Sequence, residues 1–120
     1  MSVKAKTEMD GRIGIVEIKG SLVGDKETDT FREAYVDLIE QGNKFLIINL
    51  RKVNYINSSG IGSLIGAHAS YAKIGGEVKL AGLSNNVQNL LVVTKLIDIF
   101  DTFDTVEQAI ESFVHEKSLT

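Results

Sequence analysis

Residues 44–50 read Lys-Phe-Leu-Ile-Ile-Asn-Leu, and residues 54–65 read Asn-Tyr-Ile-Asn-Ser-Ser-Gly-Ile-Gly-Ser-Leu-Ile. The first stretch is nearly continuous in apolar residues, which is typical of a strand that is covered on both faces. The second stretch begins at the end of a strand and changes to helical spacing of its apolar residues from Ile61 onward. A buried strand that leads directly into a helix is the repeating unit of α/β proteins, so these residues predict that fold class.

The chain before this stretch predicts two strands and one helix. Residues 3–8 and 13–19 are rich in strand-forming residues, and Asp10-Gly11 between them suits the tight turn of a hairpin. A helix should follow and end near Gly42, a typical C-terminal cap. Its buried face is formed by residues spaced at helical intervals: Phe31, Tyr35, Leu38 and Ile39.

The chain after it continues the alternation. Residues 59–74 predict a helix that ends at Gly75-Gly76, with one face formed by Ile61, Leu64, Ile65, His68 and Ala72. A short strand at 77–81, a helix starting at Ser84 or Asn85 and an edge strand within 99–103 should follow. A final helix begins at the capping box of Thr105 and Gln108. Its charged residues, Glu107, Glu111, Glu116 and Lys117, are predicted to form a solvated face.

Together these elements predict an α/β fold with a central, mostly parallel sheet, an N-terminal hairpin and about four helices. The chain has 120 residues and no Pro, and neither a linker nor a repeat is recognisable. We therefore expect one domain over residues 1–120.

Composition narrows the class of function. The chain has no Cys, which suits a reducing compartment, and neither a signal peptide nor an apolar stretch long enough to span a bilayer is recognisable. We expect a cytoplasmic protein without membrane insertion. The net charge of −3, with Lys and Arg scattered along the chain, argues against direct nucleic-acid binding. Proteins are the expected partners.

Ser58 is the residue on which a function can be argued. The start of a helix carries free N–H groups and partial positive charge, so a serine there can be stabilised once it is phosphorylated. Gly60 and Gly62 should leave the backbone open to a partner. The plainer interpretation is that Asn57, Ser58 and Ser59 serve only to cap the helix.

Residues 57–62 resemble the Asp-Ser-Ser-Gly-Leu-Gly signature of anti-sigma factor antagonists in the STAS family. The resemblance covers most of the chain and extends to further positions: Gly20, Asn49-Leu50, Gly75-Gly76-Glu77 and residues 80–84. It implies that Ser58 is phosphorylated and that the helix start, Asn57, Ser58, Ser59, Gly60, Ile61 and Gly62, contacts the partner. One departure is Asn57, where the family usually has Asp.

The resemblance also implies a mechanism of partner switching. The unphosphorylated protein would bind an anti-sigma factor that is also a serine kinase and so free the sigma factor, which regulates transcription. A serine phosphatase would act on phospho-Ser58 and reset the switch. The protein itself would not be an enzyme.

Two other functions stay open. The same fold serves as an accessory docking subunit of transporters. A nucleotide-binding sensor built on Gly60 and Gly62 is the weaker alternative, because Ile65 stands where a dinucleotide fingerprint has its third small residue. Ser58 and His68 lack the Gly-x-Ser-x-Gly context of a hydrolase. His68 and His115 lack the Cys or clustered acids of a metal site, so we expect neither a metal nor a cofactor.

Overall fold

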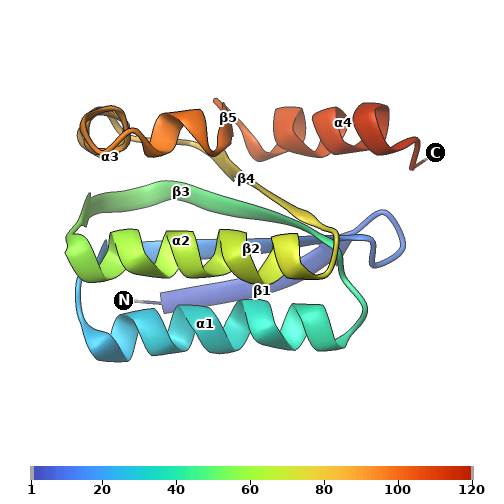
Figure 1. Cartoon of the computed structure of the whole chain (residues 1–120), viewed down its shortest axis with the longest axis horizontal. Helices are drawn as coiled ribbons and strands as arrows, with labels where there is room; N and C mark the ends of the chain where they lie inside the picture. Colours follow the sequence, from blue (N-terminus) through green and yellow to red (C-terminus); the bar gives the residue numbers. More distant parts are fainter. Residues whose placement is uncertain (1, 120) are drawn as a thin grey trace.

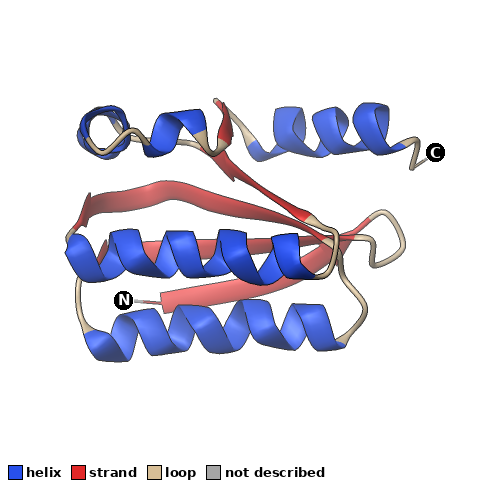
Figure 2. Cartoon of the chain, viewed as in Figure 1, coloured by secondary structure: helices blue, strands red, loops and turns tan. Residues whose placement is uncertain are grey.

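The computed structural model describes residues 2–119, which form an α/β domain (Figures 1 and 2). In chain order its elements are β1 (Ser2–Glu8), β2 (Ile13–Leu22), α1 (Asp25–Glu40), β3 (Phe45–Ile56), α2 (Ser58–Lys73), β4 (Glu77–Ala81), α3 (Asn85–Val93), the 3-10 helix η1 (Leu96–Asp98), β5 (Asp101–Phe103) and α4 (Val106–Lys117). The alternation of strands and helices that the sequence predicts is confirmed.

The five strands form one sheet in the order β1-β2-β3-β4-β5. β1 pairs with β2 antiparallel, and the other neighbours are parallel. The hairpin turns through Met9, Asp10 and Gly11, which all have positive φ. This confirms the predicted N-terminal hairpin and mostly parallel sheet.

Both faces of the sheet are covered. α1 and α2 run side by side across one face (Figure 1), and with α3 and η1 they bury a large core that includes Val16, Ile48, Leu64, Tyr71 and Leu91. On the other face, α4 covers a smaller core of Ile13, Ile15, Ile47, Ala81, Ala109 and Phe113. β3 is therefore covered on both faces, as its apolar run predicts.

Two strands are longer than expected. β2 continues to Leu22 rather than 19, and β3 continues past Leu50 to Ile56. Arg51 and Lys52 are exposed within β3 because β4 has only five residues and pairs with the first part of β3 alone. The second part of β3 pairs only with β2, which leaves it partly exposed and able to carry charged side chains.

The buried face of α2 differs from the expected one. Leu64 is buried, but Ile65 is 43% exposed and Ala72 is exposed. The face against the core is formed by Gly60, Leu64, Ala67 and Tyr71. Small residues let α2 approach β3 and α1 closely, so they replace the larger apolar residues on which the prediction relied.

Lys79 lies in β4, the short strand predicted at 77–81, and its side chain is fully buried under α4. Its ammonium group donates to Ser112 Oγ at 2.6 Å and pairs with Glu116. Glu116 is exposed, as the predicted solvated face requires, but its carboxylate also pairs with the buried Lys79 and so has a structural partner that the sequence did not predict. A buried ammonium needs charged and polar partners, and α4 supplies them.

Candidate functional site

The start of α2 presents Ser58 to solvent. Ser58 is the first helical residue and is exposed, directly after the end of β3 at Ile56 and the N-cap, Asn57. The Oδ1 atom of Asn57 accepts from the backbone N–H groups of Ser59 at 3.0 Å and Gly60 at 3.2 Å. Because Asn57 caps the helix, the Ser58 hydroxyl is not needed for that role.

Gly60 and Gly62 have different roles. Gly60 is buried, and a Cβ there would collide with the carbonyl oxygen of Leu22 and with a methyl group of Ile56. Gly62 is exposed, and a Cβ added there would meet no atom within 4 Å. The expectation of an open backbone holds for Gly62 and is wrong for Gly60, which lets the helix start pack against the end of β2.

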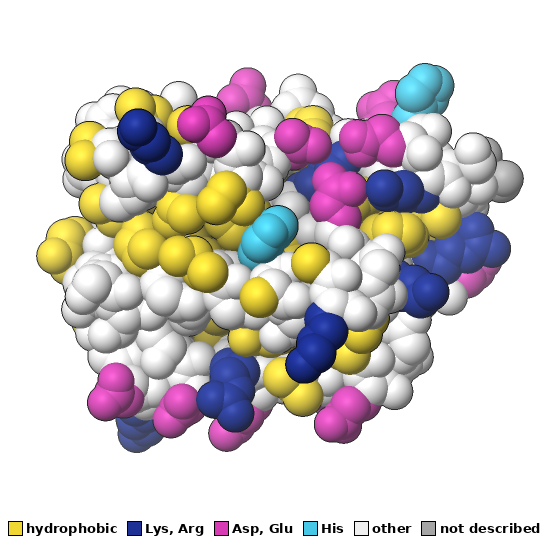
Figure 3. Space-filling model, viewed as in Figure 1, with side chains coloured by type: hydrophobic (Ala, Val, Ile, Leu, Met, Phe, Trp, Pro, Cys, Tyr) yellow, Lys and Arg dark blue, Asp and Glu magenta, His cyan; other side chains and the backbone are white. Residues whose placement is uncertain are grey.

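Ser58 lies on the rim of a groove of about 760 Å³. The groove runs between the end of β3, the start of α2 and α3, and its lining residues are Asn54, Tyr55, Ile56, Asn57, Ser58, Ile61, Asn86, Val87, Leu90 and Thr94. None of these side chains is charged. Figure 3 shows apolar side chains gathered on the same side of the molecule, over α2 and α3.

Exposed apolar side chains continue this surface. Tyr55 in the groove is 58% exposed, and Val93 at the end of α3 is 80% exposed. Large apolar side chains at such exposure are a feature of interaction surfaces when they gather beside a groove. The arrangement suits a protein contact.

The predicted site residues come together in part. Asn57, Ser58 and Ile61 line the groove, whereas Ser59 and Gly62 line a shallower hollow between α1 and α2. From their place after the predicted strand end at Ala81, Asn85-Asn86 are expected to border the partner surface or to serve a turn, and Asn86 of α3 does line the opposite wall of the groove. The helical spacing of Val87, Leu90 and Leu91 predicts α3 itself, but not which strand end it faces.

His68 packs edge-on against Phe100 with ring centres 5.5 Å apart. His68 is half-buried at the edge of the core. Gly60 does not support the alternative of a nucleotide-binding sensor. Its close packing against the end of β2 already explains why a glycine is needed there.

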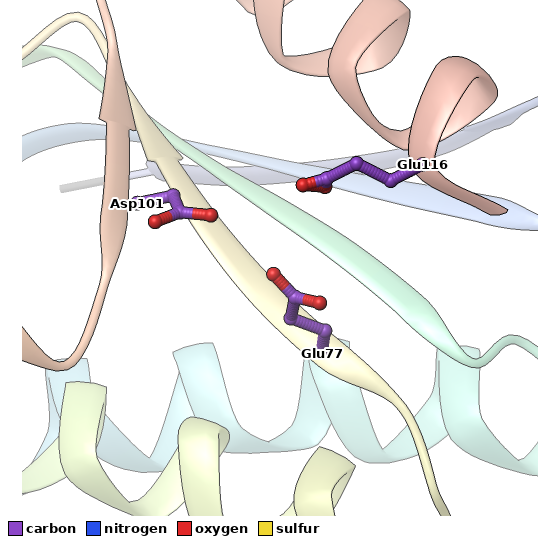
Figure 4. Close-up of side chains that lie close together, drawn as sticks. All are labelled: Glu77, Asp101 and Glu116. Atoms are coloured by element: carbon purple, nitrogen blue, oxygen red, sulfur yellow. The ribbon is translucent and has the colours of Figure 1, made fainter.

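Three carboxylates approach one another on the opposite face of the sheet, those of Glu77, Asp101 and Glu116 (Figure 4). Lys79 pairs with Glu116 and lies 4.0 Å from Asp101, and Lys117 lies 3.2 Å from Glu77. These two ammonium groups account for the clustering of acidic groups. We assign no metal site there.

Comparison with known proteins identifies the family. A model of the STAS domain matches residues 4–109, so the chain belongs to the STAS domain family. The anti-sigma-B factor antagonist of Bacillus subtilis (strain 168) is 41% identical over 70 residues, which are 58% of this chain and 63% of that protein. The match spans less than two thirds of that relative's length.

Solved structures share the fold. The Thermotoga maritima protein tm1081, described as a candidate anti-sigma factor antagonist, has a TM-score of 0.82 at 22% identity and covers 92% of each chain. Bacillus SpoIIAA in its phosphorylated form has a TM-score of 0.73 at 19% identity over 92% of this chain and 98% of that one. A sulfate transporter family protein from Wolinella succinogenes has a TM-score of 0.73 at 25% identity over 89% and 86%.

No helix within residues 2–119 combines the length and apolar character needed to cross a membrane.

Proposed function

We propose that this protein is an anti-sigma factor antagonist whose binding to an anti-sigma factor serine kinase is switched by phosphorylation of Ser58. The observation that carries the proposal is the position of Ser58: it is exposed, it begins α2, and it lines an uncharged groove. The similarity to the Bacillus subtilis antagonist supports the same function.

Phosphorylation of Ser58 would add charge to a surface whose lining residues are uncharged. A phosphate adds about −1.5 to −2 charges at neutral pH. The groove lining contains no other charged side chain, so a bound partner would have to cover a doubly charged group without a compensating cation from the lining. The helix start stabilises the phosphate and so keeps the domain folded in both states.

The unmodified protein would bind the kinase through the groove and free the sigma factor, and a serine phosphatase would restore this form by acting on phospho-Ser58. The protein would act in the cytoplasm as a binding module and not as an enzyme. The likeness to the Wolinella succinogenes protein keeps a docking role in a transporter as the second candidate. Ser58 beside the groove favours the switch.

Two variants test the proposal against the purified anti-sigma factor kinase of the host. Ser58→Ala keeps the surface uncharged, so it should bind at least as tightly as the wild type. Ser58→Asp adds part of the phosphate charge to the uncharged groove, so its affinity for the kinase should be at least ten-fold lower. A ten-fold loss of affinity corresponds to about 1.4 kcal/mol. Ser118→Asp adds the same charge after α4 and serves as the control. Equal affinities of all three variants would contradict the switch.

A further inference from the structure

Helix α4 covers only part of its face of the sheet. The buried residues under it come from the first halves of β2 and β3 and from β4. The rest of this face, on β1, β2 and β3, carries exposed and half-buried polar side chains, and we call it the open sheet face. Its polar residues are mostly basic: Lys4, Lys6, Glu17, Lys19, Asn49, Arg51 and Lys52.

The alternation of side chains along β1 and β2 directs the lysines to this face. Val3 of β1 and Ile18 of β2 pack on the large core that α1 and α2 cover. Their neighbours Lys4 and Lys19 therefore point to the opposite face. Lys4 lies directly across from Glu17 in the β1–β2 register.

A β-bulge brings two further cations to the open sheet face. The register of β3 with β2 shifts by one residue between Asn49 and Lys52. Leu50 and Val53 both belong to the large core. The two residues between them, Arg51 and Lys52, therefore both point to the open sheet face, whereas a regular strand would send one of them to the core.

The charges on this face are only partly balanced. Lys52 pairs with Glu17 at 3.4 Å, and Lys6 pairs with Glu8 at 3.7 Å. The other cations of the face form no ion pair within residues 2–119: Lys4, Lys19 and Arg51. The face therefore has an excess of positive charge, although the whole chain has a net charge of −3, and it should attract acidic groups.

The open sheet face is separate from the groove beside Ser58. A hollow of about 510 Å³ lies between the strands and the first turn of α4, and Lys4 and Lys6 line it. This hollow shares no lining residue with the groove. A partner on the open sheet face would therefore contact a different surface from the one that phosphorylation changes.

Two features favour a polypeptide over a nucleic acid as the partner. Glu17 lies among the cations, and Asp104 and Glu107 line the hollows beside them, so a continuous row of phosphates would also meet carboxylates. β1 is the outer strand of the sheet, and the edge of such a strand can pair with an extended peptide. Lys4 and Lys6 stand two residues apart, which matches carboxylates at alternate positions of an added strand.

We infer that the open sheet face and the edge of β1 bind an extended acidic segment of a partner protein. This inference goes beyond the proposed function and does not depend on it. A labelled peptide of about ten residues with alternating Glu and Thr is a suitable probe, because its carboxylates share one face of a strand. Fluorescence anisotropy measures its affinity for the wild-type protein. A peptide of alternating Gln and Thr should not bind.

Two double variants test where the acidic peptide binds. Lys4→Gln with Arg51→Gln removes two cations that form no ion pair, so the affinity should fall at least five-fold. Lys26→Gln with Lys44→Gln makes the same change in net charge at exposed positions, in the first turn of α1 and directly before β3, and should bind within about two-fold of the wild type. Equal losses in the two variants would overturn the inference.

An NMR titration of the wild-type protein gives the same answer without substitutions. The amide signals of Lys4 and Arg51 should shift with the acidic peptide, and that of Lys26 should not. Single-stranded DNA of similar length should bind at least five-fold more weakly than the peptide. No binding of the peptide, shifts confined to other surfaces, or tighter binding of DNA to these residues would each overturn the inference.

Discussion

The ammonium group of Lys79 lies 4.4 Å from the centre of the Phe113 ring, and thereby joins the middle of β4 to the buried side of α4. Ser112 and Glu116 lie one position before and three positions after Phe113 and accept from the same ammonium group. One buried cation therefore attaches the C-terminal helix to the sheet through a ring face, a hydroxyl group and a carboxylate.

The effect of a substitution at Lys79 on the free energy of unfolding should depend strongly on the new residue. Lys79→Ala removes both the charge and the buried stem and leaves a cavity, so the free energy of unfolding should fall by about 2–4 kcal/mol. Lys79→Met fills the same space without the charge, and Glu116 is exposed enough to be hydrated, so the loss should be about 1 kcal/mol or less. Urea denaturation measures both values. A Lys79→Ala variant as stable as the wild type would contradict this account.

The same contact should make stability depend on pH. The hydrogen bond from Lys79 is the main cause that holds the pKa of Glu116 below its ordinary value of 4.5. A depressed pKa in the folded state stabilises the protein above the unfolded pKa, and this contribution is lost as pH falls from about 4.5 through the folded pKa. Thermal unfolding between pH 6 and pH 3 should show a smaller loss of Tm in Glu116→Gln than in the wild type. If Tm falls equally with pH in both proteins, Glu116 does not contribute to the pH dependence of stability.

The two glycines of the helix start give a matched pair. Gly60→Ala places a methyl group against the backbone of Leu22 and should destabilise the protein by about 1–3 kcal/mol. Gly62→Ala meets open space on an exposed helix and should stabilise the protein by about 0.5–1 kcal/mol. Chemical denaturation of the two variants checks the opposite signs. Equal effects would mean that α2 does not pack on β2 as described.

Periodicity was enough to predict the order of the elements, because each helix and strand carries its own local pattern. It could not predict which face of α2 is buried, since that face depends on how closely Gly60 and Ala67 let the helix approach its neighbours. Nor could it predict the burial of Lys79. Its partners Ser112 and Glu116 lie more than thirty residues later, and only the tertiary fold brings them together.

For the site, the local signals at residues 57–59 predict a helix start, which is confirmed, and the structure shows that Ser58 is exposed there. The position of Asn85-Asn86 after a strand end indicates a border of the partner surface, but the groove itself was not predictable, because its second wall comes from the packing of α3. Asn85 and Asn86 both begin that helix, yet only Asn86 lines the groove. Adjacent side chains on a helix point in different directions, and the sequence does not show which one faces Ser58.

Substitutions at Asn85 and Asn86 test whether the groove contacts the kinase while leaving Ser58 unchanged. Asn86→Asp keeps the size of the side chain and adds one negative charge to the groove, so the affinity for the kinase should fall about ten-fold. Asn85→Asp adds the same charge one residue away, outside the groove lining, and should bind within about two-fold of the wild type. Both changes lie in the first turn of α3, where an acid is tolerated, so Tm should not fall. Equal loss of affinity in the two variants would contradict the groove as the contact.

The most direct test of the switch is to incubate the purified protein with ATP and lysate of its own host and to map phosphorylated peptides by mass spectrometry. Ser58→Ala is the control, and a second host protein known to be phosphorylated shows that the lysate contains active kinases. The account predicts phosphate on Ser58 in the wild type and no phosphate on the corresponding peptide of Ser58→Ala. An unmodified Ser58 in such a lysate would contradict the switch and favour a constitutive docking role.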